Sequence, residues 1–146
     1  EKSIQKFKQI KGSGISFNLS CSEVIVVEVD PLESDLVLYN LFKNSLEACK
    51  NESAPLISIT VEESEQEAVI QIRDNGPEIS EDLVNSIFIP KVSQKTDGLG
   101  LGLSICKALA ESQGGCLSAI RNAEGHLVMK LCLLKADSVK EIGENQ

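Results

Sequence analysis

The feature that most constrains the fold of this 146-residue chain is a long apolar helix that begins close to residue 31. Asp30 can cap this helix, Pro31 suits its first position, and Glu33 follows three residues after the cap. The sequence therefore predicts a helix over about residues 31–50. Its apolar residues cover more than one face, which indicates a largely buried helix: Leu32, Leu36, Leu38, Leu41, Phe42, Leu46 and Ala48.

Alternating apolar residues predict strands both before and after this helix in the sequence. Two hairpins are expected, each with two short apolar segments joined by a polar turn. Before the helix, the alternating residues of segment 15–19 and the β-branched run of segment 24–29 fit one or two strands. In chain order the predicted strand segments are 15–19, 24–29, 57–61, 68–72, 117–120 and 127–134.

Two further helices are predicted between the hairpins. Ser80 can cap a short helix that runs to about residue 88, and Pro90 interrupts the pattern after it. A glycine-rich loop over residues 98–102 then leads into a helix that stops at Gly114. The loop therefore leads directly into the N-terminus of a helix.

Three polar features could bind a ligand, although each has an ordinary structural alternative. The glycine loop leaves backbone N–H groups accessible at a helix N-terminus, which favours an anion, but it could be a simple hinge. Asp74 ends a predicted strand two residues before Gly76, where an ordinary Asx turn is the favoured interpretation for this residue taken alone. Asn40 and Asn44 lie one turn apart on the long helix, and an amide such as Asn44 could simply hydrogen-bond a neighbouring backbone.

Charge and composition narrow the choice of ligand. The net charge of −8 argues against nucleic acid, because a nucleic-acid binder needs a basic surface. An anionic ligand would therefore need local positive charge, which a divalent cation can bring. A small polyphosphate with such a cation meets this requirement. No segment approaches the roughly 18 apolar residues of a membrane span, and none of the five cysteines is expected to be functional.

The order of these motifs resembles a known family. Asn40 to Asn44, Asp74 to Pro77, Ile87 to Pro90 and Gly98 to Leu103 look like the asparagine, first glycine, phenylalanine and second glycine boxes of sensor histidine kinases. These kinases form one branch of the gyrase, chaperone, kinase and mismatch-repair ATPases, known as the GHKL superfamily. The resemblance runs from about residue 15 to residue 134. It implies an α/β (α+β) two-layer sandwich, the Bergerat fold, with a mixed sheet of about five strands, three helices on one face and an ATP lid over residues 89–99.

The resemblance also implies ATP and Mg²⁺ as cofactors and assigns a role to several residues. Asn44 would ligate Mg²⁺, Asp74 would accept a hydrogen bond from the adenine amino group, and Gly76 would let the ring approach. Lys95 would contact the phosphates, with Lys43 or Lys91 as further sources of charge. The complete set of expected binding residues is Asn40, Lys43, Asn44, Asp74, Gly76, Ile79, Lys95, Gly98, Leu99, Gly100, Leu101, Gly102 and Leu103.

Position 40 distinguishes the branches of this superfamily. Hydrolysing members carry a Glu there, whereas Asn40 cannot act as a general base. The resemblance therefore implies transfer of the γ-phosphoryl group to a histidine on a separate dimerisation domain, and from there to a response regulator. The only histidine of this chain, His126, is expected to be structural or exposed. The alternatives are a related ATPase or serine kinase, or a docking module of the same fold that has lost its nucleotide.

The chain also departs from the family pattern at several positions. Glu78 replaces the second glycine of the first glycine box, Leu99 replaces a small or hydroxyl residue, Glu47 replaces a basic residue, and Gln113 replaces a histidine. The expected organisation is a linker or the tail of a dimerisation helix over 1–14, the catalytic domain over 15–135, and a polar tail over 136–146. The resemblance implies a cytoplasmic domain without direct membrane or nucleic-acid contact, whose parent protein can be anchored in the inner membrane.

Overall fold

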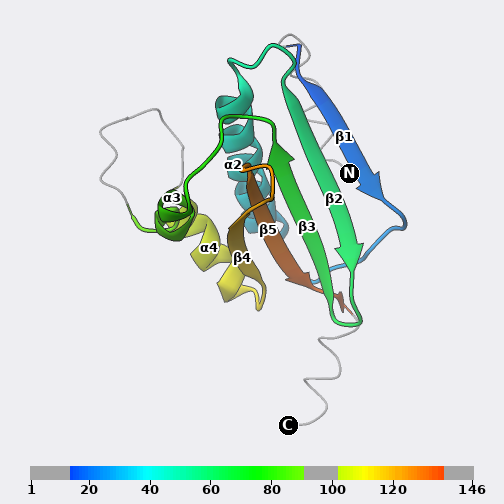
Figure 1. Cartoon of the computed structure of the whole chain (residues 1–146). Coiled ribbons are helices and arrows are strands. Elements are labelled where there is room, and N and C mark those ends of the chain that lie inside the picture. The colour runs from blue at the N-terminus through cyan, green and yellow to red at the C-terminus, as the bar shows by residue number, and fades with distance from the viewer. Residues whose placement is uncertain (1–13, 91–101, 137–146) are drawn as a thin grey trace.

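The computed structural model describes residues 14–90 and 102–136, which form a five-stranded sheet and three helices (Figure 1). The strands are β1 (Ser16–Cys21), β2 (Leu56–Glu63), β3 (Glu67–Asp74), β4 (Cys116–Arg121) and β5 (Leu127–Leu134). Their order in the sheet is β1-β2-β3-β5-β4, in which β1 runs parallel to β2 and the other pairs are antiparallel. The expected mixed sheet is confirmed.

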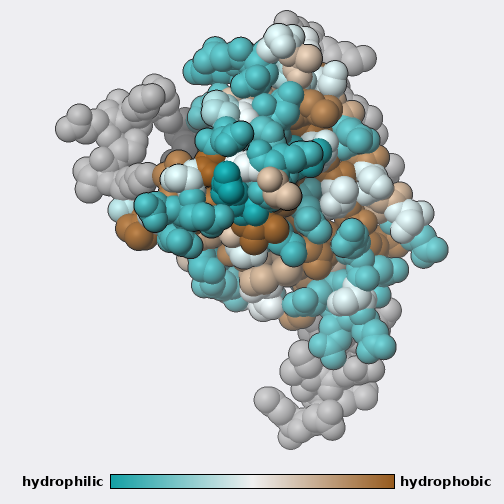
Figure 2. Space-filling view, in the orientation of Figure 1, coloured by the Kyte–Doolittle hydropathy of each residue, from teal (hydrophilic) through white to brown (hydrophobic). Residues whose placement is uncertain are grey.

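The helices are α2 (Pro31–Cys49), α3 (Glu81–Ser86) and α4 (Leu103–Ser112). Strand side chains alternate between the two faces of a sheet, and the buried strand residues pack with buried residues of α2 and α4 in one core. Its largest fully buried members are Phe42, Leu41, Ile57, Ile59, Ile72, Leu117 and Leu131. Figure 2 shows hydrophilic side chains with hydrophobic patches between them on the side where Figure 1 presents the strands. The apolar core lies between the sheet and the helices, because it joins buried residues of the strands, α2 and α4.

The start of α2 is fixed by its cap, as the sequence predicts. One Asp30 oxygen accepts hydrogen bonds from the N–H groups of Leu32 at 2.9 Å and Glu33 at 3.0 Å, and Pro31 occupies the first helical turn. The Asp30 N–H group in turn donates to the side-chain oxygen of Gln113 at 2.7 Å. Gln113, which stands where the family often has a histidine, therefore ties the end of α4 to the start of α2.

Replacing Asp30 with Ala should lower the free energy of unfolding by about 1 kcal/mol, because two N–H groups at the start of α2 lose their acceptor. Urea denaturation of the two proteins measures this difference. Asp30→Asn is the matched control, since an asparagine oxygen can accept the same bonds. An Ala variant as stable as the wild type would contradict a role for this cap.

Of the one or two strands expected before α2, β1 forms and the segment over residues 24–29 does not form a strand. Only Val27 pairs, through an isolated bridge to Lys135, and Val24 is 92% exposed. A strand needs a neighbour with free backbone groups. β4 covers its edge of β5 as far as Cys132, so this segment meets β5 just at its end. There the Glu28 N–H donates to the Leu134 carbonyl oxygen at 3.2 Å, and the Ala136 N–H donates to the Val26 carbonyl oxygen at 3.2 Å.

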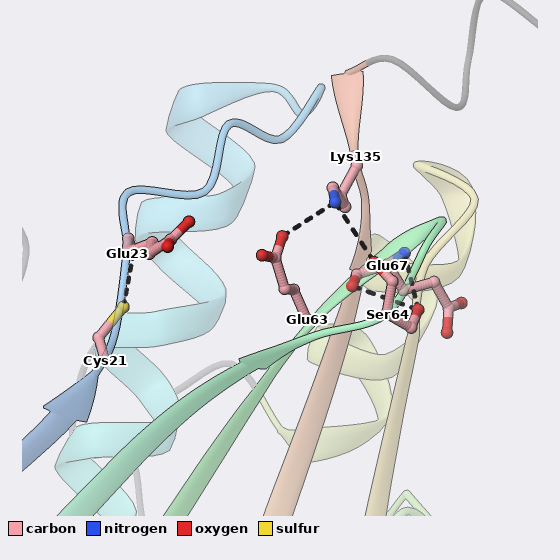
Figure 3. A network of polar contacts seen from close by, with 6 residues as sticks. All are labelled: Cys21, Glu23, Glu63, Ser64, Glu67 and Lys135. Atoms are coloured by element: carbon pink, nitrogen blue, oxygen red, sulfur yellow. Dashed lines mark hydrogen bonds and ion pairs between the residues drawn. The ribbon is translucent and has the colours of Figure 1, made fainter.

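The end of β5 is attached to the turn between β2 and β3 (Figure 3). The Lys135 ammonium group lies 2.9 Å from a carboxylate oxygen of Glu63 and 3.3 Å from the carbonyl oxygen of Ser64. Its backbone N–H donates to Gln66. Lys135 therefore holds the last strand against the hairpin, which keeps the central strands in register.

Candidate functional site

A cavity of about 800 Å³ lies between α2, the segment that follows β3, and the N-terminus of α4. It brings together segments that are far apart in the sequence. The expected binding residues that line it are Asn40, Lys43, Asn44, Asp74, Ile79, Gly102 and Leu103. Lys91, Lys95, Gly98, Leu99, Gly100 and Leu101 fall outside the described residues, together with most of the expected lid.

Asp74 is the buried acid of this cavity. It is the last residue of β3 and is only 8% exposed. One of its carboxylate oxygens accepts a hydrogen bond from the Gly76 N–H group at 3.0 Å. Burial raises the pKa of Asp74 above 3.8, and the hydrogen bonds from Gly76 and Ser45 and the charge of His126 oppose that rise. The fold therefore holds a largely desolvated carboxylate at the wall of a cavity. Buried groups with a shifted pKa are typical of sites that bind a polar ligand.

Ser45 is a site residue that the sequence interpretation missed. Its side chain is 4% exposed on α2, and its hydroxyl hydrogen-bonds to the Asp74 carboxylate. A buried hydroxyl directly after Asn44 on an apolar helix was the available signal. Without the fold, nothing in the sequence pairs it with an acid 29 residues later.

Gly76 brings the strand end close to α2. A Cβ atom at this position would lie 2.8 Å from the Ala48 carbonyl oxygen and 2.8 Å from an Asp74 carboxylate oxygen. These distances are shorter than a real Cβ contact allows. The turn from Asp74 to Gly76 can therefore adopt this close approach only with glycine.

The two amides of α2 have different environments. Asn40 is 2% exposed, and its amide nitrogen donates to the Leu36 carbonyl oxygen of its own helix at 2.8 Å. Asn44, one turn later, is exposed at the cavity wall. Lys43 lies 3.9 Å from Glu47 in a half-exposed ion pair, so the unexpected acid at position 47 partly neutralises this lysine.

The N-terminus of α4 faces the same cavity. Gly102 is its N-cap residue and supplies no side-chain hydrogen bond, and Leu103 and Ser104 follow it in the cavity wall. The first N–H groups of a helix have no acceptor within the helix, and the helix dipole adds a partial positive charge there. This end of the cavity therefore suits an anion.

Glu78, which departs from the family pattern, is held by the hairpin between β4 and β5. Its carboxylate lies 3.9 Å from the guanidinium of Arg121. Arg121 also donates to the Ile79 carbonyl oxygen at 2.7 Å, and the Ile79 N–H donates to Gly125 at 2.9 Å. The β4–β5 hairpin therefore contacts this segment through the Glu78 side chain and through the Ile79 backbone.

These groups suit a ligand with a nucleobase at one end and phosphates at the other. A carboxylate such as Asp74 can accept a hydrogen bond from an exocyclic amino group, and a helix N-terminus can bind phosphate. Within residues 14–90 and 102–136, no group of three or more His, Cys, Asp or Glu side chains could hold a metal ion. No helix in the described part of the chain is long and apolar enough to cross a membrane.

Comparison with known proteins supports this interpretation. Residues 29–137 match the sequence model of the family described as "Histidine kinase-, DNA gyrase B-, and HSP90-like ATPase". The sensor protein KdpD of Clostridium acetobutylicum is 34% identical in an alignment 119 residues long, which covers 77% of this chain and 13% of KdpD. The chain spans only 13% to 22% of the length of such curated relatives.

Solved structures give the same result. The catalytic domain of histidine kinase ThkA superposes with a TM-score of 0.74 and 30% identity, covering 90% of this chain and 88% of that one. ThkA in complex with the response regulator protein TrrA also superposes, with a TM-score of 0.74 and 27% identity, covering 92% of this chain and 40% of that one. The resemblance inferred from the sequence motifs and the expected fold class are both confirmed.

Proposed function

Because the chain belongs to the family of histidine kinase-, DNA gyrase B- and HSP90-like ATPases, we propose that it binds Mg-ATP in the described cavity and donates the γ-phosphoryl group to a protein histidine. One observation carries this proposal: a single cavity is lined both by the buried Asp74 carboxylate and by the N-terminus of α4, which has no side-chain cap. A nucleobase and a phosphate chain need these two features together.

At the base end, Asp74 accepts a hydrogen bond from the adenine amino group. Ser45 and the Gly76 N–H group hold the carboxylate in position, so little reorganisation is needed when the base enters. Gly76 keeps the turn close to α2, and Ile79 supplies an apolar contact for the ring. Adenine binding in this proposal depends on a rigid polar group surrounded by apolar side chains.

At the phosphate end, backbone N–H groups of the second glycine box bind the phosphate oxygens. Gly98, Leu99, Gly100, Leu101, Gly102 and Leu103 are assigned to this role, and Lys95 and Lys43 add positive charge. Asn40 and Asn44 face the cavity from α2, and Asn44 is assigned as the protein ligand of Mg²⁺. When bound, Mg²⁺ neutralises phosphate charge, which an acidic chain with a net charge of −8 cannot do alone.

Phosphoryl transfer is proposed in preference to hydrolysis. Asn40 has no proton-accepting group that could activate water, and its amide already bonds to its own helix. His126 is not proposed as the acceptor, because its Nδ1 atom contacts the Gly76 carbonyl oxygen at 2.9 Å. The proposed acceptor is a histidine on a dimerisation domain of the same protein, in the cytoplasm. ThkA has been solved with the response regulator TrrA, and we propose a response regulator as the final acceptor here as well.

The test is phosphoryl transfer from ATP labelled in the γ-phosphate to the dimerisation domain of the parent protein. The expected product is a labelled dimerisation domain whose phosphate is lost in acid and kept in alkali, as a phosphohistidine behaves. Replacing the acceptor histidine with Gln should abolish labelling. Release of free phosphate without labelling would instead indicate an ATPase. Both phosphoryl transfer and hydrolysis require that the chain binds nucleotide.

Replacing Asn44 with Ala should remove the effect of Mg²⁺ on nucleotide affinity, because the cation loses its protein ligand. We expect ADP affinity in the presence of Mg²⁺ to fall by about tenfold or more, to the value measured without the cation. Calorimetric titration with and without Mg²⁺ measures this. Asn51→Ala is the control, since Asn51 is an exposed amide outside the cavity. Full Mg²⁺ dependence in the Asn44 variant would contradict the assignment.

A further inference from the structure

The side chain of His126 contacts the turn that carries Asp74, although the two lie far apart in sequence. His126 stands at the start of the β5 segment, just after the turn of the β4–β5 hairpin, and its Nδ1 atom is 2.9 Å from the Gly76 carbonyl oxygen. A carbonyl oxygen only accepts, so Nδ1 must carry the hydrogen. Figure 1 shows this hairpin turn at the same end of the sheet as the end of β3.

The position of His126 is itself fixed by hydrogen bonds. Its backbone N–H donates to the side-chain oxygen of Asn122 at 2.8 Å, and the same oxygen accepts from Glu124 at 3.1 Å. Beyond the turn, the Ile79 N–H donates to Gly125. The ring therefore contacts Gly76 from a hairpin turn that Asn122 fixes internally and that a hydrogen bond attaches to Ile79.

The turn held by His126 is the one that positions Asp74. Gly76 accepts from His126 through its carbonyl oxygen and donates from its N–H group to Asp74 at 3.0 Å. One residue therefore links the imidazole to the buried carboxylate. A shift of this turn would move the carboxylate and the close contact with α2 together.

The charges around this turn are mostly paired. Arg121 lies 3.9 Å from Glu78, and Arg73 lies 3.4 Å from Glu124. Arg73 is exposed on β3 and points to the opposite face of the sheet from Asp74. The charged group that acts electrostatically on the pKa of Asp74 is His126, and its charge lowers that pKa against the larger effect of burial.

We propose that His126 is a positioning residue of the adenine site and that it extends nucleotide binding to lower pH. The hydrogen bond to Gly76 fixes the turn, and the imidazolium charge favours the carboxylate form of Asp74. A histidine ordinarily carries its charge in the acid range where carboxylates titrate, so the two effects act together there. This inference rests on the proposed function, because it concerns the same nucleotide site.

Two substitutions separate the hydrogen bond from the charge. His126→Asn places an amide nitrogen at the same number of bonds from the backbone as Nδ1, so it keeps a donor and loses the charge. His126→Ala loses both. ADP titrations at about pH 8 should show near wild-type affinity for the Asn variant and about 2- to 10-fold weaker binding for the Ala variant. Equal affinities of all three proteins would overturn the positioning role.

The charge is tested by following the Asp74 carboxyl carbon by NMR as the pH falls, without nucleotide. In His126→Asn the midpoint should move to higher pH, because the charge that lowers the pKa of Asp74 is gone. ADP binding should then fail at a correspondingly higher pH. Arg73→Gln is the control, since it removes a positive charge near the same hairpin on the other face, and its midpoint should not move. An unchanged Asp74 midpoint in His126→Asn would overturn the electrostatic role.

This design also separates the inference from the proposed function. If the wild-type protein bound no ADP at any pH, the proposed function would fail. The NMR titration would still report whether His126 acts on Asp74. Thermal unfolding of each variant shows whether it is folded. If the Ala variant is unfolded, the hydrogen bond to Gly76 contributes to folding of this turn, and the Asn variant still carries the test of the charge.

Discussion

Replacing Asp74 with Asn is expected to weaken ADP binding by about 10- to 100-fold while making the nucleotide-free domain more stable. The loss of affinity follows from the loss of a charged acceptor, since a hydrogen bond to a charged group contributes about 1.5–3 kcal/mol. The amide keeps the shape of the side chain and an oxygen for the Gly76 N–H group. The turn should therefore survive the substitution.

The gain in stability follows from the direction of the pKa shift. Burial raises the pKa of Asp74 in the folded protein, so the folded state binds a proton more readily than the unfolded state. Stability therefore falls as the pH rises from the ordinary pKa of 3.8 through the raised value. Above that window the ionised carboxylate costs stability, and Asn removes this cost.

Two measurements check this prediction: calorimetric titration with ADP, and thermal unfolding of the nucleotide-free proteins at neutral pH. Asp82→Asn is the control, because Asp82 is an exposed carboxylate on α3. It should change neither quantity appreciably. If the Asp74 variant bound ADP with wild-type affinity, Asp74 would have no role in nucleotide binding. Reduced stability would mean that the carboxylate contributes to the apo fold more than its burial costs.

Replacing Gly76 with Ala should abolish measurable ADP binding and lower the free energy of unfolding by about 1–3 kcal/mol. The added methyl group would lie 2.8 Å from the Ala48 carbonyl oxygen and from an Asp74 oxygen. Backbone must move to relieve the first contact, so the turn leaves α2. The adenine site would then lose the position of the Asp74 carboxylate and the close approach of the Gly76 turn to α2.

Gly102→Ala is the matched control for stability in urea denaturation. A Cβ atom there meets nothing closer than the Ser104 hydroxyl oxygen at 3.5 Å, so a smaller loss is expected. Equal losses for the two variants would show that crowding at Gly76 is not the cause. A Gly76 variant that bound ADP normally would contradict the need for close approach at this turn.

Elements whose signals are local could be predicted from the sequence. Asp30 and Pro31 fix the start of α2 with contacts two or three residues away, so the cap was readable without the fold. The same is true of Ser80, which accepts from the Leu83 N–H group at the start of α3. The segment 24–29 failed because a strand also requires a partner, and pairing is not a property of the segment alone.

The candidate site was only partly predictable for the same reason. Asp74 and Asn44 were predicted as binding residues from motif order, and both line one cavity. Ser45 and His126 were not predicted to lie at this candidate site, because their contacts with the Asp74 turn cross long separations in sequence, 50 residues for His126 and Gly76. Arg121 was missed as the partner of Glu78 for the same reason. Residues that support a site from another element carry no motif of their own.

The most direct test of the central claim is calorimetric titration of the wild-type chain with ADP, with and without Mg²⁺. The proposed function predicts saturable binding at one site per chain, tightened by Mg²⁺. The result that would contradict it is the absence of detectable binding in a protein that unfolds cooperatively. The cavity beside Asp74 would then belong to a domain that has kept the fold of its family without its nucleotide.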